Sequence, residues 1–169
     1  MLAKLKPSIR PLPPGLAFFS PTVLIATWFG SGRIRPASGT IGTLAALPFG
    51  IVIGAIGGPA GLALAALILF FIGKAAAEAY GKKSGSSDDQ AIVVDEAVGL
   101  WIAGIPAAAA PGLWIIAFIL FRFFDIYKPW PASFFDERKN GGFDVMMDDV
   151  IAGIFAFFGV ATLSLFLVS

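Results

Sequence analysis

Long uncharged stretches alternate with short polar segments along the chain. Four stretches of 20 or more residues contain no charged side chain, and they cover 11–32, 36–73, 97–121 and 150–169. About 20 apolar residues suffice to cross the ~30 Å hydrocarbon core of a bilayer. The pattern therefore predicts a polytopic membrane protein.

The first half of the chain predicts three apolar elements. Residues 16–29 are too few to cross a bilayer and contain Pro21, so they predict a short interfacial or re-entrant helix. Residues 41–57 and 60–80 predict two apolar helices joined by a Gly-Gly-Pro turn at 57–61. Gly50, Gly54 and Gly58 recur every four residues, a spacing that permits close helix contact.

The second half predicts a shorter hairpin and a final helix. Helices are expected at about 94–105 and 113–124, joined by a turn at 106–112. Residues 126–146 are polar and predict irregular structure, and 147–168 predict a last apolar helix that starts at an aspartate pair.

The placement of charge predicts the topology. The turns at 57–61 and 106–112 carry no charge, so the polar ends of both hairpins are expected on one side of the membrane, together with all Lys and Arg from Arg33 onward. The bias of Lys and Arg toward the cytoplasm assigns that side as cytoplasmic. The prediction is an all-α polytopic membrane protein of short helical hairpins. It forms one domain over 1–169, with a basic, proline-rich lead-in at 1–15.

Composition narrows the chemistry. Hydrophobic residues make up 57% of the 169 residues and charged residues 14%, against roughly 25% charged in a typical soluble domain. The chain has no Cys and no His, which excludes thiolate nucleophiles, histidine bases and Ser-His-Asp triads. A net charge of +1 without a long basic face argues against nucleic acid as a partner.

Five carboxylates are predicted to meet on the cytoplasmic side. Asp95 and Glu96 open one apolar helix, Asp148 and Asp149 open another, and Asp125 ends a helix that returns to the same face. A single acid at such a position is explained by helix capping, worth ~0.3–1 kcal/mol. Two doublets and a fifth acid favour a cation site, and a set of oxygen ligands without His or Cys favours Mg²⁺.

A second group of residues is basic and glycine-rich. The loop at 29–43 offers backbone N–H groups, Arg33 and the hydroxyl of Thr40 to a phosphate, while Arg122 and Lys128 flank Asp125. It is neither a Walker A loop nor a dinucleotide fingerprint. A tight turn at the membrane surface explains the same glycines, so the loop alone does not decide the function.

Three sequence blocks are similar to a known family. FGSGRIRPASGTIGTLAALPF (29–49), IVVDEAVGLWIAG (92–104) and FRFFDIYKPWPASFFDERKNGGFDVMMDDVIAGIFA (121–156) resemble the signature blocks of the phosphatidylglycerophosphatase A family. The resemblance covers nearly the whole chain from about residue 20. Two positions depart from the family pattern: Ser38 stands where Pro is usual, and Asp144 stands where Gly is common.

The resemblance implies a Mg²⁺-dependent lipid phosphatase of the bacterial inner membrane. Its expected reaction removes the terminal phosphate of phosphatidylglycerophosphate to leave phosphatidylglycerol. The family's functional acids match the five acids already identified: Asp95, Glu96, Asp125, Asp148 and Asp149.

The residues suggest a division of roles, and they leave alternatives open. All five acids are candidate metal ligands, and catalytic roles are expected for Asp95, Glu96, Asp125 and Asp149, with Asp95 or Glu96 taking a proton from water. Phosphate binding is expected of Arg33, Thr40, Arg122 and Lys128. An aspartyl-phosphate intermediate ranks below water attack. The competing classes are a divalent-cation transporter or channel, which needs acids near the bilayer midplane, and a lipid-binding scaffold. The number of metal ions and the oligomeric state stay open.

Overall fold

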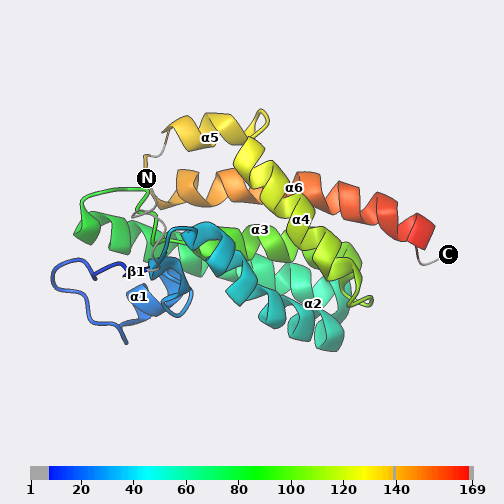
Figure 1. The fold of residues 1–169 in the computed structure, drawn as a ribbon, viewed down its shortest axis with the longest axis horizontal. Coiled ribbons are helices and arrows are strands. Elements are labelled where there is room, and N and C mark those ends of the chain that lie inside the picture. The colour runs from blue at the N-terminus through cyan, green and yellow to red at the C-terminus, as the bar shows by residue number, and fades with distance from the viewer. Residues whose placement is uncertain (1–7, 139, 168–169) are drawn as a thin grey trace.

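Helices form almost all of the regular structure in the computed structural model, which describes residues 8–138 and 140–167 (Figure 1). The elements follow in the order β1 Ser8–Ile9, α1 Pro21–Ala26, η2 Ser31–Arg33, β2 Ile34–Arg35, α2 Ser38–Ser84, α3 Val94–Gly104, η3 Ile105–Ala107, α4 Leu113–Tyr127, α5 Ala132–Arg138 and α6 Gly142–Leu167. The expected all-α class is confirmed, apart from one antiparallel pair of two-residue strands, β1 and β2.

Helix α2 consists of two limbs, as the sequence predicts. The backbone is not helical at Gly58, which has φ 62° and ψ −166°, a conformation that favours glycine. The ribbon turns back at this point (Figure 1). Helix α2 and α6 are both long and apolar enough to cross a membrane by length and composition. The number of crossings and their orientation stay predictions.

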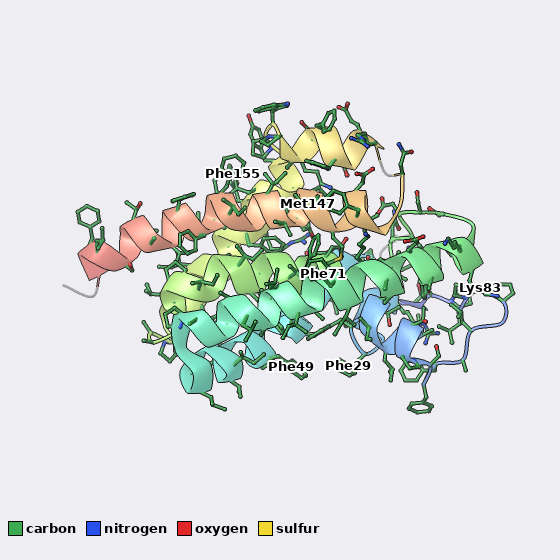
Figure 2. The ribbon with its side chains drawn as sticks, turned by 180° about the vertical axis from the view of Figure 1, so that it is seen from behind. Phe29, Phe49, Phe71, Lys83, Met147 and Phe155 are labelled. Atoms are coloured by element: carbon green, nitrogen blue, oxygen red, sulfur yellow. The ribbon has the colours of Figure 1, made fainter. Side chains whose placement is uncertain are left out.

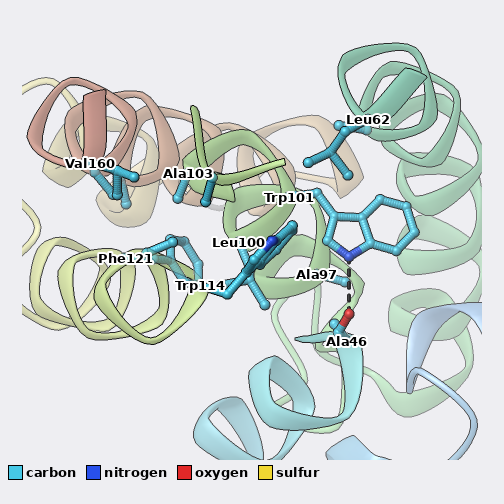
Figure 3. Packing of buried hydrophobic residues seen from close by; sticks show 14 of the residues in the cluster. Ala46, Leu62, Ala97, Leu100, Trp101, Ala103, Trp114, Phe121 and Val160 are labelled. Atoms are coloured by element: carbon cyan, nitrogen blue, oxygen red, sulfur yellow. Dashed lines mark hydrogen bonds between the residues drawn. The ribbon is translucent and has the colours of Figure 1, made fainter. Parts of the chain in front are cut away.

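Helix α3 lies between α2 and α6, and most of its side chains are buried (Figure 1). Trp101 of α3 donates a hydrogen bond from Nε1 to the carbonyl of Ala46 on α2, at 3.1 Å. Leu100, Trp114 and Phe121 pack into the same apolar cluster (Figure 3). The two short helices α3 and α4 correspond to the predicted hairpin at 94–124, so the core is built around its first limb.

Small residues allow the close packing around α3. A Cβ atom added to Gly99 would lie 2.6 Å from the carbonyl oxygen of Asp149, and one added to Gly153 would lie 2.5 Å from the carbonyl oxygen of Gly99. The backbones of α3 and α6 therefore touch at this point. The prediction for the four-residue glycine repeat is confirmed for Gly50, which packs against two tryptophans, and for Gly54. It is wrong for Gly58, where no atom lies within 4 Å of an added Cβ.

Many large apolar side chains point away from the core. Phe71 on α2 is 63% exposed and Phe49 is 45% exposed, and both lie on the outside of the bundle in Figure 2. Only 11% of the most apolar 18-residue window of α2 is buried inside the protein. Helix α2 thus exposes more apolar side-chain surface than a core helix of a soluble protein, which is mostly buried.

Three predicted boundaries are wrong. The final helix begins at Gly142 rather than at 147, and the segment expected to be irregular contains α5. The early start is possible because Asp144 accepts a hydrogen bond from the backbone N–H of Asn140, at 3.0 Å, and Gly142 packs against the backbone of α2. The short helix expected over 16–29 covers only Pro21–Ala26, because Pro21 begins it after an N-cap at Ser20. The predicted lead-in falls partly outside the described residues, and its described part includes β1.

Candidate functional site

An acidic pocket opens where α3 begins and α4 ends. This cavity, which we call the acidic pocket, has a volume of about 150 Å³. The residues that line it are Ser38, Asp88, Gln90, Ile92, Asp95, Glu96, Asp125, Lys128, Asp148 and Asp149. All five acids singled out by the sequence line it. Their convergence, expected from hairpin topology alone, is confirmed.

The helices bring the acids to the pocket in different ways. Asp95 and Glu96 lie in the first turn of α3, and Asp125 lies in the last turn of α4. Asp148 and Asp149 do not open α6, because that helix begins six residues before Asp148. The capping explanation is therefore wrong for this doublet, and helix geometry alone gives no reason for two buried acids there.

Three carboxylates lie close enough together to share one cation. One oxygen from each of Asp95, Glu96 and Asp149 lies within 4.8 Å of the other two. Asp95 and Asp149 are 8% and 3% exposed, so water screens their mutual repulsion poorly. Glu96 Oε2 is buried and has no hydrogen-bond partner among the described residues. Such an arrangement is typical of a cation site, because an unpartnered buried carboxylate oxygen is costly.

Lys128 is the basic side chain that lines the pocket. Its ammonium donates to Asp136 at 2.6 Å and to Asp148 at 2.7 Å. Burial by itself would lower the pKa of Lys128, but the attraction of Asp148 and the hydrogen bonds to both carboxylates outweigh burial and raise that pKa above its ordinary value. Lys128 is thus held as a cation at the edge of the pocket.

Arg122 lies behind the acids rather than in the pocket lining. Its guanidinium forms an ion pair with Asp125 and approaches the hydroxyl of Thr43 at 3.5 Å. A Cβ atom added to Gly39 would lie 2.5 Å from Glu96 Oε1 and 3.2 Å from Arg122 Nη1, so the glycine lets the start of α2 approach both groups. Arg122 offsets part of the negative charge from the protein side.

The other two residues expected to bind phosphate do not line the acidic pocket. Arg33 lines a separate, largely apolar cavity of about 480 Å³. Its Nε donates to the carbonyl of Arg10 at 2.9 Å, and its guanidinium lies over the ring of Phe18. Thr40 lies half-buried in the first turn of α2. Both predictions treated residues 29–43 as one phosphate-binding loop. In the structure, η2, β2 and the start of α2 divide that segment.

Three polar residues of the pocket were not identified from the sequence as site residues, namely Asp88, Gln90 and Ser38. The first two lie in the segment between α2 and α3, and the third begins α2. The polar segment that directly precedes α3, the helix of Asp95 and Glu96, was the signal in the sequence that could have pointed to Asp88 and Gln90. The pocket therefore has six carboxylates, with Lys128 in its lining and Arg122 adjacent, which leaves an excess of negative charge.

Comparisons with known proteins identify a family for the chain. The profile of the family described as "Phosphatidylglycerophosphatase A" matches residues 24–164. A protein named phosphatidylglycerophosphatase A from Haemophilus influenzae is 40% identical over 145 residues, covering 83% of this chain and 87% of the relative. A protein of the same name from Escherichia coli is 36% identical over 141 residues, covering 82% and 81%.

A third relative has a different name. A Bacteroides thetaiotaomicron protein, named provisionally as a phosphatidylinositol-3-phosphatase, is 40% identical over 156 residues, covering 82% of this chain and 91% of the relative. No solved structure matches the chain. The chain therefore belongs to the phosphatidylglycerophosphatase A family, whose members are phosphatases that hydrolyse a phosphate monoester.

Proposed function

We propose that this protein is a Mg²⁺-dependent phosphatase that converts phosphatidylglycerophosphate to phosphatidylglycerol and inorganic phosphate. The observation that carries the proposal is the acidic pocket itself, in which carboxylates from three helices converge beside a lysine in a member of a lipid phosphatase family. The cation-channel alternative is not favoured, because both relatives with the family's name are phosphatases.

The residues present fit Mg²⁺. The pocket offers carboxylate oxygens without sulfur or imidazole, three of them already mutually close, and the unpartnered Glu96 Oε2 is available as a ligand. Asp95, Glu96 and Asp149 would hold the ion, and Asp125 and Asp148 line the same pocket. When bound, Mg²⁺ supplies charge neutralisation for phosphate oxygens and lowers the pKa of a coordinated water.

The chain's own groups account for the remaining chemistry. Lys128 has a third ammonium N–H beyond the two that Asp136 and Asp148 accept, and this N–H is available to a phosphate oxygen. Asp95 or Glu96 accepts the proton that the attacking water loses. A bond forms between the water oxygen and phosphorus, the bond from phosphorus to the glycerol oxygen breaks, and the leaving alcohol takes up the proton that the carboxylate accepted.

The proposed setting is the bacterial inner membrane, with α2 and α6 inserted and the acidic pocket facing the cytoplasm. The exposed apolar faces of these helices support insertion. Ser86 after α2 and Asn140 before α6 line one polar cavity of about 300 Å³, so these two segments lie on the same side. Lys82 and Lys83 lie in the last turn of α2 nearby, as the Lys/Arg bias requires of a cytoplasmic face.

Removal of divalent cations tests the metal requirement. Purified protein is expected to release phosphate from phosphatidylglycerophosphate, to lose this activity in EDTA, and to regain it with Mg²⁺ more than with Ca²⁺, which prefers more ligands and a looser geometry. The same assay on phosphatidic acid and phosphatidylinositol 3-phosphate ranks the lipid substrates. Full activity in excess chelator would contradict the metal assignment, and a higher rate on either other lipid would contradict the substrate assignment.

Cysteine labelling tests the orientation. Because the chain has no native Cys, single cysteines at Ser86 and Asn140 are expected to react with an impermeant reagent only from the cytoplasmic side. One at Gly57, where no atom lies within 4 Å of an added Cβ, is expected to react only from the opposite side. Labelling of the Asn140 position from outside intact cells would refute the proposed orientation.

A further inference from the structure

Arg10 connects the N-terminal segment to the rim of the acidic pocket. It lies outside the residues matched by the family profile, which begin at 24. Its backbone N–H donates to the carbonyl of Arg33 at 2.7 Å, and its own carbonyl accepts from Arg33 Nε at 2.9 Å. These bonds extend the pairing of β1 with β2 and fix where the Arg10 side chain begins.

The Arg10 guanidinium binds two consecutive residues of the segment between α2 and α3. Nη1 donates to Asp89 Oδ1 at 2.8 Å, and Nη2 donates to Gln90 Oε1 at 2.6 Å. The Arg10 and Asp89 side chains are 14% and 17% exposed, so water screens this pair less than it would screen a surface ion pair. Asp89 Oδ1 also accepts from the backbone N–H of Ala91, at 2.9 Å. A fork of two donors therefore holds this segment just before Asp95.

The contact with Arg10 fixes the orientation of the Gln90 amide. A guanidinium has donors only, so the Gln90 atom that faces it is the carbonyl oxygen Oε1. The amide nitrogen Nε2, with two N–H groups, is thereby turned away from Arg10 and donates to no other described residue, on a side chain that lines the acidic pocket. Without Arg10 the amide could turn, and its oxygen would then add to the acceptors already crowded there.

The pocket has few donors for an anionic headgroup. Six of its ten lining residues are carboxylates. Lys128 already donates to Asp148 of the lining and to Asp136 beside it. Among the lining residues, the other side chains that carry a hydrogen-bond donor are Ser38 and Gln90. The amide N–H groups of Gln90, an exposed residue that lines the pocket, are therefore well suited to an oxygen of the substrate headgroup.

We propose that Gln90 binds the lipid headgroup through its amide N–H groups and that Arg10 is a positioning residue that orients it. The proposal rests on the proposed phosphatase function. The acceptor is a headgroup oxygen, either of the phosphate or of the glycerol hydroxyl. Because the contact is present in bound substrate and transition state alike, its loss raises KM and leaves kcat little changed.

Five variants test the proposal with short-chain phosphatidylglycerophosphate and saturating Mg²⁺. Gln90→Leu and Arg10→Met are each expected to raise KM about threefold to tenfold, the effect of losing one hydrogen bond, with kcat within about twofold of wild type. The KM of the double variant is expected to be no higher than the higher KM of the two single variants, since both substitutions remove the same contact. Arg35→Met is the matched control on β2, an exposed arginine outside the pocket lining, and is expected to keep the wild-type KM.

The outcomes separate this proposal from the proposed function. A wild-type protein that releases no phosphate contradicts the proposed function. An active wild type with an unchanged KM in Gln90→Leu overturns the headgroup contact, and this exposed side chain can be replaced without affecting the core. KM effects that multiply in the double variant, or an Arg10→Met variant that loses only thermal stability, overturn the positioning role.

Arg10→Lys, which retains the charge but not the fork, is expected to give an intermediate KM. With phosphatidic acid, which lacks the headgroup glycerol, an equal KM rise assigns the contact to phosphate and an unchanged KM assigns it to the hydroxyl.

Discussion

The Asp149→Asn variant is expected to fold and insert normally and to release phosphate at least ~10²-fold more slowly than wild type. Asn is close to Asp in size, so the contact between α6 and α3 beside this residue is retained. The substitution removes a negative charge from the three carboxylates that approach within 4.8 Å of one another. Losses of this size are usual when a group that moves a proton or holds a reacting ligand is neutralised.

Stability gives a second measurement that separates a functional role from a structural one. Without divalent cations, Asp149→Asn is expected to melt at the same temperature as wild type or higher, because a buried, mutually repelling acid has been neutralised. Wild type is expected to gain thermal stability when Mg²⁺ is added, since a ligand that binds only the folded state stabilises it. The variant is expected to lose most of that gain.

Asp144→Asn is the matched control on the same helix. Asp144 is also buried, but it accepts a hydrogen bond from the backbone of Asn140 and lies 3.7 Å from Arg138 Nε, outside the acidic pocket. Asn retains the acceptor, so turnover is expected to stay near the wild-type level. Equal losses in both variants would show that any buried acid of α6 is needed for folding, and near-normal turnover in Asp149→Asn would remove this residue from the site.

Much of the helical layout could be predicted because it depends on local chemistry. The turn at Gly58 follows from a Gly-Gly-Pro sequence between two apolar runs, and α3 and α4 follow from short apolar runs on either side of Pro106. The start of α6 could not be predicted in this way. It depends on the packing of Gly142 against α2 and on the bond between Asn140 and Asp144, neither of which is visible in a hydropathy pattern.

The convergence of the five acids could be predicted, but the positions of Arg33 and Thr40 away from them could not. Helix ends on one face of a hairpin bundle converge, so Asp95 and Asp125 were placed correctly by topology alone. Arg33 was expected beside them because it is close in sequence to α2, yet it is held by the N-terminal segment and lines a different cavity. Loop residues such as Gln90 reach the pocket through tertiary contacts, and no periodic pattern records these.

The contact between α3 and α6 determines whether the acids meet, and at Gly99 the two backbones touch. A methyl group at this position would lie 2.6 Å from the carbonyl oxygen of Asp149 and 2.3 Å from a ring carbon of Phe121. The ring can shift, but the carbonyl belongs to the α6 backbone. Gly99→Ala is therefore expected to push α6 outward at Asp149, the residue that must approach Asp95 and Glu96.

Two effects of Gly99→Ala are expected together. Overpacking of a tight core contact costs about 1–3 kcal/mol of stability, and misplacement of a catalytic group by about 1 Å costs up to ~10²-fold in rate. The measurements are the melting temperature in detergent and phosphate release per folded protein, with Mg²⁺ saturating. Gly61→Ala on α2 is the control, because no atom lies within 4 Å of its added Cβ. That substitution is expected to stabilise the helix by about 0.5–1 kcal/mol and to leave turnover unchanged.

The combination of results identifies the cause. If Gly99→Ala melts earlier but each folded molecule keeps its wild-type turnover, the glycine serves packing only, and the acids tolerate a displaced α6. If the melting temperature and the turnover of Gly99→Ala both fall and those of Gly61→Ala do not, the close approach of two backbones is what assembles a site from acids on separate helices. Wild-type stability and turnover in Gly99→Ala would contradict the contact itself, because a methyl group cannot occupy a gap of 2.6 Å to a backbone oxygen without moving one of the helices.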